Sequence, residues 1–252
     1  MSRSLLIRLQ AAGLHVLGSM LVIGLFLGLV YGFWYPSPYH IVFSTFDVVK
    51  VLIGVDLVLG PLLTLIVFNV AKPRKELVRD MGFILAVQLG ALAWGAYVTY
   101  SVRPQFVAFF EQDVYVLTAK DVDMANIPSA IPRRSFMSTP TAVYVDGPQT
   151  FEEITQHVAD MITRGKPDVA FQPERYRSYI DNRDKVRIAA LRVDDIRKQN
   201  DVAAVWVDGL QGYTHLVFFN IHSGSYESVA AVDAETGVIK SVMPQIGTAS
   251  KK

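Results

Sequence analysis

The sequence predicts a membrane protein with three transmembrane α-helices followed by an α+β periplasmic domain with an antiparallel sheet. Three long apolar stretches fill the first hundred of the 252 residues. The densest basic cluster of that region, residues 72–75 with Arg79, lies between the second and third stretches. Beyond Ser101 charged residues recur every few positions, as they do in a water-soluble domain. We therefore expect one domain over residues 1–101 and a second over residues 102–252.

The membrane spans are predicted at residues 11–34, 48–70 and 81–101. Each is long enough to cross a hydrocarbon core of about 30 Å as a helix. A cleaved signal peptide is the alternative for the first span. Its apolar run exceeds the usual length of such a region, and no small-x-small cleavage site precedes the Pro36-Ser-Pro38 turn, so we predict a retained helix.

The distribution of Lys and Arg predicts the orientation. Arg3 and Arg8 precede the first span, the loop over residues 35–47 has neither residue type, and the loop after the second span has four. Because cytoplasmic loops are enriched in Lys and Arg, the N-terminus is expected in the cytoplasm. The C-terminal domain is then expected in the periplasm, which makes this a multi-pass protein of the bacterial inner (cytoplasmic) membrane.

Composition excludes several classes of protein. The part of the chain after residue 101 carries 17 Lys and Arg against 19 Asp and Glu, a net charge of −2, which argues against nucleic-acid binding. The chain has no cysteine, which excludes a disulfide framework, a thiolate metal site and a cysteine nucleophile.

Two of the spans have faces of small residues at helical spacing, which permit close contact between helix backbones. The simpler interpretation is that these faces pack on each other within the chain. The alternative is that one of them receives a helix from a different protein. The residues are Gly24, Gly28 and Gly32 in the first span and Gly82, Ala86 and Gly90 in the third.

The second span contains an acid within an apolar run. Asp56 is followed by Gly60-Pro61 and by Thr64. A carboxylate at such a position costs about 2.5–3.5 kcal/mol on insertion scales, so it should face protein or a water-filled cleft. Asp56, Gly60 and Thr64 share one helix face because they are four residues apart. Pro61 lacks a backbone donor and is expected to kink the helix just after the acid.

A proton or ion relay through Asp56 would need a second titrating group at similar depth. Asp56 lies about eight residues, or about 12 Å, below the outer end of its span. His15 and Gln88 are expected in the cytoplasmic half, at a different depth. A structural or partner-binding role for Asp56 is therefore favoured over transport, and His15 is expected to be a packing residue.

In the second domain, strand patterns alternate with helical ones. Thr150-Phe-Glu-Glu153 is a capping box that opens a helix to about Arg164, with Phe151, Ile154, Val158 and Met161 on one side. A second helical region is expected over residues 173–199, and the glycine of Asp233-Ala-Glu-Thr-Gly237 indicates a hairpin. Strands are predicted at residues 106–110, 114–117, 142–145, 202–207, 214–220, 226–232 and 238–242.

No catalytic constellation is evident, so we predict neither an enzyme nor a bound cofactor or metal. His157, His215 and His222 do not occur in a metal-ligand spacing. The chain has no GxSxG elbow and no glycine-rich phosphate loop.

The second span and the loop after it carry a resemblance to a known family. The stretch Asp56-Leu-Val-Leu-Gly60-Pro61-Leu-Leu-Thr64, followed by Lys72-Pro-Arg-Lys-Glu-Leu77 and Asp80, resembles the type IV pilin accessory protein family, the TfpX/TfpZ group of bacterial inner-membrane proteins. The Arg103-Pro104 exit into an aromatic strand and the closing hairpin are also similar, so the likeness covers nearly the whole length.

The resemblance implies a non-catalytic helper in type IV pilus biogenesis, with the major type IV pilin and other pilus assembly components as partners. Such a helper affects the stability, assembly or surface display of the pilin. Asp56, Gly60, Pro61 and Thr64 match only as signature positions. We expect the membrane helices, through these residues and the small-residue faces, to hold the apolar helix of the pilin while the second domain contacts its head.

Two other functions stay open at this point. One is a membrane-anchored periplasmic sensor or ligand-binding module, which would need a separate signalling partner because the second loop is only about ten residues long. The other is a membrane enzyme or transporter that uses Asp56.

Overall fold

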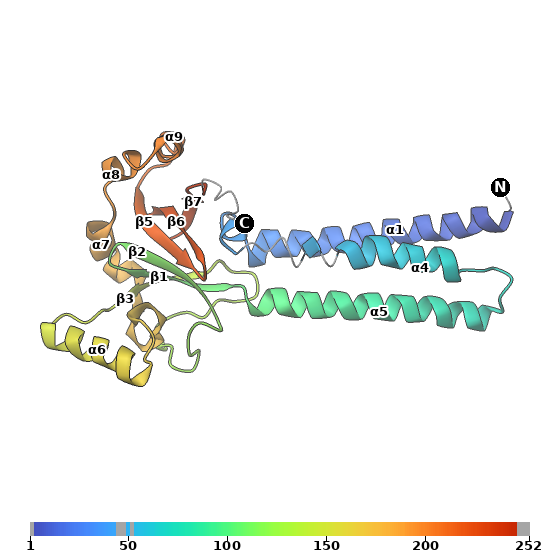
Figure 1. Ribbon diagram of the computed structural model, residues 1–252, viewed down its shortest axis with the longest axis horizontal. Coiled ribbons are helices and arrows are strands. Elements are labelled where there is room, and N and C mark those ends of the chain that lie inside the picture. The colour runs from blue at the N-terminus through green and yellow to red at the C-terminus, as the bar shows by residue number, and fades with distance from the viewer. Residues whose placement is uncertain (1–2, 44–48, 51–52, 246–252) are drawn as a thin grey trace. The chain divides into compact units, whose positions relative to one another are not determined.

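The computed structural model describes residues 3–43, 49–50 and 53–245, and the chain divides into two compact units (Figure 1). The helical unit contains Met1–Trp34 and Ser44–Ser101. The sheet unit contains Val102–Lys252 together with Tyr35–Phe43, a segment that precedes most of the helical unit in the chain. The two units are described separately.

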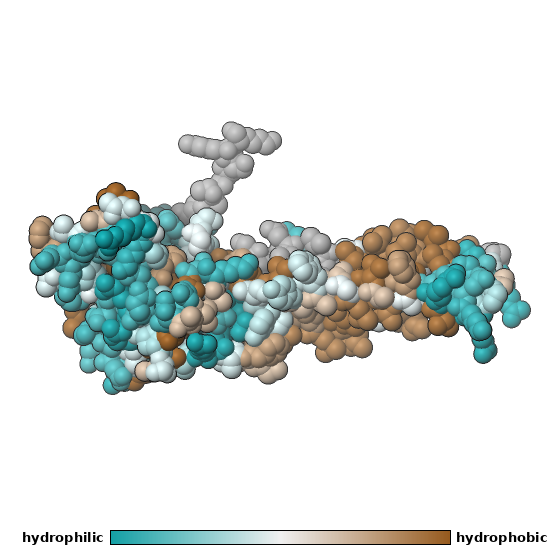
Figure 2. All heavy atoms as spheres, turned by 90° about the horizontal axis from the view of Figure 1, so that it is seen from below, coloured by the Kyte–Doolittle hydropathy of each residue, from teal (hydrophilic) through white to brown (hydrophobic). Residues whose placement is uncertain are grey.

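Helix α1 (Arg3–Leu29) continues into a π-helical turn, η1 (Val30–Trp34), and helix α5 (Arg74–Ser101) is of similar length. Both are long and apolar enough to cross a membrane. Figure 2 shows apolar side chains gathered over the helical unit, with hydrophilic residues at the end that carries the N-terminus.

The predicted span at residues 48–70 coincides with a shorter apolar helix. A π-helical segment, η2 (Gly54–Leu59), leads directly into α4 (Gly60–Val67). Val48, where that span was expected to begin, lies outside the described residues, as do residues 51–52. Two spans are therefore supported by length and composition, and the third stays a prediction.

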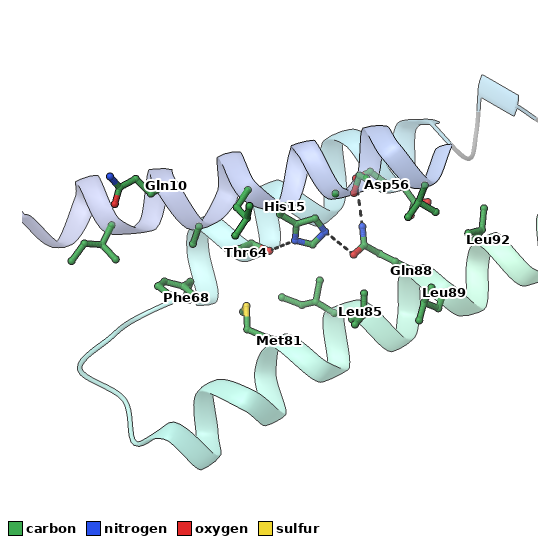
Figure 3. Close-up of a pocket in the computed structure, with 17 residues that line it drawn as sticks. Gln10, His15, Asp56, Thr64, Phe68, Met81, Leu85, Gln88, Leu89 and Leu92 are labelled. Carbon is green, nitrogen blue, oxygen red and sulfur yellow. Dashed lines mark hydrogen bonds between the residues drawn. The ribbon is translucent and has the colours of Figure 1, made fainter. Parts of the chain in front are cut away.

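Helices α1 and α5 run in the same direction. Their C-terminal ends meet where the rings of Trp34 and Tyr100 pack with centroids 5.2 Å apart. Both helices pack against α4, which runs in the opposite direction between them (Figure 3).

The sheet unit is built on one mixed sheet of seven strands in the order β4-β3-β1-β2-β5-β6-β7. The prediction of an antiparallel sheet is wrong for two of the six pairings, because β1 and β3 are parallel, as are β2 and β5. A parallel pair needs a long crossover, which residues 119–140 and the helices before β5 provide. The strands are β1 (Pro104–Phe110), β2 (Asp113–Thr118), β3 (Thr141–Val145), β4 (Tyr176–Ser178), β5 (Leu216–Ser223), β6 (Tyr226–Asp233) and β7 (Ile239–Val242).

Apolar clusters cover both faces of the sheet. Along β1, Val107 and Phe109 pack into one cluster while Phe106 and Ala108 pack into another, because successive side chains of a strand point to opposite faces. Tyr39, from the short helix α2 (Tyr39–Val42), is buried in the first of these clusters. Residues between the first two apolar stretches therefore complete the core of the sheet unit.

Helix α6 (Phe151–Arg164) begins with the capping box that the sequence predicts. The Glu153 backbone N–H donates to Thr150 Oγ1 at 3.2 Å, and the Glu153 carboxylate accepts from the Gln149 and Thr150 backbone N–H groups. These N–H donors lower the pKa of the Glu153 carboxyl below its ordinary value. The helix ends at Gly165, whose φ of +64° is left-handed.

The second helical region is shorter and more broken than predicted. Residues 169–199 form two 3₁₀ turns, η3 (Val169–Phe171) and η4 (Pro173–Arg175), then strand β4 and two helices, α7 (Tyr179–Ala189) and α8 (Val193–Arg197). The strand predicted at residues 202–207 is wrong, since helix α9 (Asp201–Asp208) lies there. Asn200 Oδ1 caps this helix by accepting from the Ala203 backbone N–H at 2.8 Å, and Ala203 and Val207, one turn apart, are its buried residues.

We expect Gly237→Ala to destabilise the protein more than Gly224→Ala. Both glycines have positive φ, so each alanine pays about 1 kcal/mol for the left-handed conformation. A Cβ at Gly237 would also lie 2.6 Å from Ala142 Cβ, whereas nothing lies within 4 Å at Gly224. Such overpacking adds about 1–3 kcal/mol. Thermal unfolding of the full-length protein in detergent measures the difference, and equal losses for the two variants would contradict this account.

Candidate functional site

The helical unit contains a buried polar cluster centred on His15 of α1 (Figure 3). His15 Nδ1 lies 2.7 Å from Thr64 Oγ1 of α4, and His15 Nε2 lies 2.8 Å from Gln88 Oε1 of α5. Because an amide oxygen can only accept, Nε2 carries the hydrogen. The Thr64 hydroxyl also lies 3.0 Å from the Gly60 backbone carbonyl, and its single hydrogen is donated either to that oxygen or to Nδ1. One imidazole therefore connects all three helices.

Asp56 adjoins this cluster. Its backbone carbonyl accepts from Gln88 Nε2 at 3.4 Å, and its side chain is only 4% exposed. The expectation that Asp56 lies at a different depth from His15 and Gln88 is wrong, because Gln88 bridges the two. Within the part of the chain that the structure describes, the Asp56 Oδ1 atom is buried and has no hydrogen-bond partner.

Gly60 provides the space in which the cluster forms. A Cβ at this position would lie 2.0 Å from Gln88 Nε2 and 3.0 Å from His15 Nε2. Asp56, Gly60, Pro61 and Thr64 are all buried. The π-helical segment η2 ends just before Pro61, so the helix changes its winding between the acid and the proline, where a kink was expected.

A cleft of about 670 Å³ opens beside the cluster, lined mainly by apolar side chains of α1 and α5. His15, Thr64, Gln88 and Asp56 supply polar groups to its lining, as Figure 3 shows. Sequence reasoning missed the connection between His15 and Gln88. The available signal was that each is an isolated polar residue on an otherwise apolar helix.

The small-residue faces do not pack on each other, so the simpler interpretation of them is wrong. A Cβ added at any of Gly24, Gly28, Gly32, Gly82 or Gly90 would meet no described atom within 4 Å beyond its own helix backbone. Ala86 is likewise exposed. These faces are open on the surface of the helical unit.

The sheet unit also exposes an apolar surface. Phe151 and Ile162 of α6 are 86% and 79% exposed, whereas His157 of the same helix is buried. The apolar side of this amphipathic helix therefore faces outward. We call this surface the α6 stripe; it consists of Phe151, Ile154, Val158, Met161 and Ile162.

The three histidines of the sheet unit lie in separate environments. His222 Nε2 is 3.1 Å from Asp113 Oδ1, and its ring stacks on Tyr115 at 5.1 Å. His157 is the buried residue of α6, and His215 precedes β5 with a positive φ of 62°. Among the described residues no group of three or more His, Cys, Asp or Glu side chains could hold a metal ion.

We expect Gly60→Ala to destabilise the protein, although alanine normally stabilises a helix by about 1 kcal/mol relative to glycine. The added methyl group would displace the Gln88 amide and break its bond to His15, and each buried polar group left unpaired costs about 1–3 kcal/mol. Gly13→Ala is the control, because nothing lies within 4 Å of that position. Thermal unfolding in detergent compares the variants; if Gly60→Ala is as stable as Gly13→Ala, Gly60 is not required for the cluster.

Comparison with known proteins identifies the family. The sequence model of a family described as "Fimbrial assembly protein FimB" matches residues 3–43. A "Fimbrial assembly protein, serogroup E1" of Dichelobacter nodosus is 31% identical over 185 residues, which cover 72% of this chain and 70% of that protein. No solved structure matches the chain significantly.

Two further relatives from the same organism align over shorter stretches. The "Fimbrial assembly protein, serogroup I" is 36% identical over 123 residues, so the match spans about half of each chain, 49% of this one and 48% of the relative. The "Fimbrial assembly protein, serogroups C1 and C2" is 35% identical over 121 residues, or 48% of this chain and 92% of the relative. This chain therefore belongs to the FimB family of fimbrial assembly proteins.

Proposed function

We propose that this protein is a non-catalytic accessory factor of type IV pilus biogenesis, anchored in the bacterial inner membrane, which acts on the major pilin to affect its stability, assembly or surface display. The observation that carries this proposal is the match to a fimbrial assembly protein over 72% of the chain. The open helix faces and the α6 stripe supply surfaces on which such a factor can bind a protein partner.

The parallel course of α1 and α5 supports a third membrane crossing. Because Trp34 and Tyr100 meet at the C-terminal ends of the two helices, residues 35–73 must return to the end where α5 begins. If α1 and α5 both span the bilayer, that return is itself a crossing. With the basic residues at 72–79 in the cytoplasm, the sheet unit would lie in the periplasm.

This topology predicts the activity of reporter fusions. Alkaline phosphatase requires the oxidising periplasm to form its disulfides. Fused after Lys252 it should be active, and fused after Lys75 it should be inactive. Activity measured in whole cells, normalised to the amount of fusion protein, tests the orientation. The opposite pattern would remove the basis for a periplasmic sheet unit.

Two surfaces are suited to two parts of a pilin. The open faces containing Gly28 and Gly90 permit close approach of an apolar helix within the membrane. The α6 stripe offers five exposed apolar side chains on the sheet unit, and full burial of each stabilises a complex by about 1.5–3 kcal/mol before the costs of association. A contiguous apolar surface of this kind is typical of a protein contact site. We assign it to the pilin head.

Ile162→Asp should reduce the amount of pilin displayed on the cell surface at least tenfold. A charge in the α6 stripe opposes burial against a partner, but at an exposed position it should change folding stability by less than about 0.5 kcal/mol. Ile188→Asp is the matched control, since Ile188 of α7 is 86% exposed and lies outside the stripe. Surface pilin and the level of the variant protein are measured together. Equal effects of the two variants would exclude α6 as the contact.

A further inference from the structure

We propose that the cleft between α1 and α5 is the seat of the pilin's apolar helix, and that this helix presents a hydrogen-bond donor to Asp56. The inference rests on the proposed function and goes further by naming the groove and the chemistry of its occupant. The open glycine faces also permit contact with a helix, but the groove alone combines this with a buried carboxyl oxygen that has no hydrogen bond among the described residues, so we assign the pilin helix to the groove.

The shape of the cleft fits a helix. Its α1 wall includes Ala11, His15, Gly18, Ser19 and Val22, which follow helical spacing along one face. The α5 wall repeats this spacing from Met81 to Leu92, and the eleven steps between these residues extend for about 16 Å, or three helical turns. The cleft is therefore an elongated groove with two helical walls, in which a further helix can lay its side chains.

The α1 wall is low. Nothing lies within 4 Å of a Cβ built at Gly18, and Ala11 and Ser19 are also small. Small residues let two helix backbones approach closely, which is the main source of packing energy between helices in lipid. The larger side chains are on the α5 wall, where Leu85 and Leu89 can pack between the side chains of an incoming helix.

The Asp56 side chain determines which kind of polar group the docked helix must carry. The polar side chains of His15, Thr64 and Gln88 bond to one another, but Asp56 Oδ1 has no partner among the described residues although its side chain is almost fully buried. A buried carboxyl oxygen without a hydrogen bond is costly, more so in an apolar environment. The Asp56 side chain lines the groove, so a small rotation would bring this oxygen to a hydroxyl, amide or ammonium donor on the docked helix. A hydrocarbon chain would fill the groove but leave this oxygen unpaired.

We test whether the pilin helix binds in the groove by site-specific photo-crosslinking, in cells that make the full chain and its pilin. Crosslinkers replace Val22 and Leu85, which line the groove, or their neighbours Leu21 and Val87, which do not. Capture of the pilin helix should be at least fivefold higher from the groove positions. The proposal is overturned if all four positions capture pilin equally, or if the groove positions capture only lipid or this chain's own segments.

Filling the groove gives an independent test. Gly18→Leu should reduce pilin capture from Leu85 at least tenfold, whereas Gly13→Leu, outside the groove, should not. Leucine is a better helix former than glycine, so a loss of α1 cannot explain the effect. Unchanged capture in Gly18→Leu would show that the pilin helix lies elsewhere.

Two substitutions of Asp56 test whether the docked helix donates a hydrogen bond to this residue. Asp56→Asn keeps an acceptor oxygen and should retain at least half of the pilin capture, while Asp56→Leu should lose at least 80% of it at an equal level of folded protein. Full capture by Asp56→Leu overturns the hydrogen bond to the occupant. Loss in both variants indicates that an ionisable group is needed and also overturns it.

The outcomes separate this inference from the proposed function. If crosslinkers at Gly28 or Gly90 capture pilin while those at Val22 and Leu85 do not, the groove is not the seat but the accessory role stands. If no position captures pilin and cells lacking the protein display normal pili, the accessory role itself is wrong.

Discussion

The helical unit depends on the imidazole of His15, which bonds to α4 through Thr64 and to α5 through Gln88. If the helical unit lies in lipid, no hydrophobic force selects one arrangement of its apolar helices, and polar contacts and close packing determine how they meet. A single side chain that satisfies partners on two other helices fixes their rotation and their relative height. Gly60 is part of this arrangement because a larger residue would occupy the space of the Gln88 amide.

The same contacts explain why a cleft persists. Both α1 and α5 pack against α4, and the bonds from His15 lie along the line where the three helices meet. The groove beside them has mainly apolar walls, whereas Asp56 Oδ1 has no hydrogen-bond partner among the described residues. On the proposal above, an occupant that brings a donor is therefore favoured over lipid, which brings none.

Features that depend on residues close together in the sequence could be predicted. Features that depend on contacts between distant segments could not. The Thr150 capping box and the left-handed Gly237 follow from short-range chemistry and were predicted. The parallel strand pairs and the contact of His15 with Gln88, 73 residues apart, depend on which segments meet, which no local pattern encodes. Residues 202–207 have β-branched residues typical of a strand, but the Asn200 cap and the burial of Ala203 and Val207 one turn apart favour a helix.

The core of the sheet unit is built from two separate segments of the chain. Tyr39 and Val42 are buried among strands that follow them by more than sixty residues, so the chain between the first two apolar stretches is part of the sheet unit's core. A fragment that begins at Val102 would lack both side chains and leave a gap in this cluster. The sheet unit can therefore complete its core only when residues 35–43 join residues 102–252, so the packing of the domain that carries the α6 stripe depends on a segment that precedes α4 and α5 in the chain.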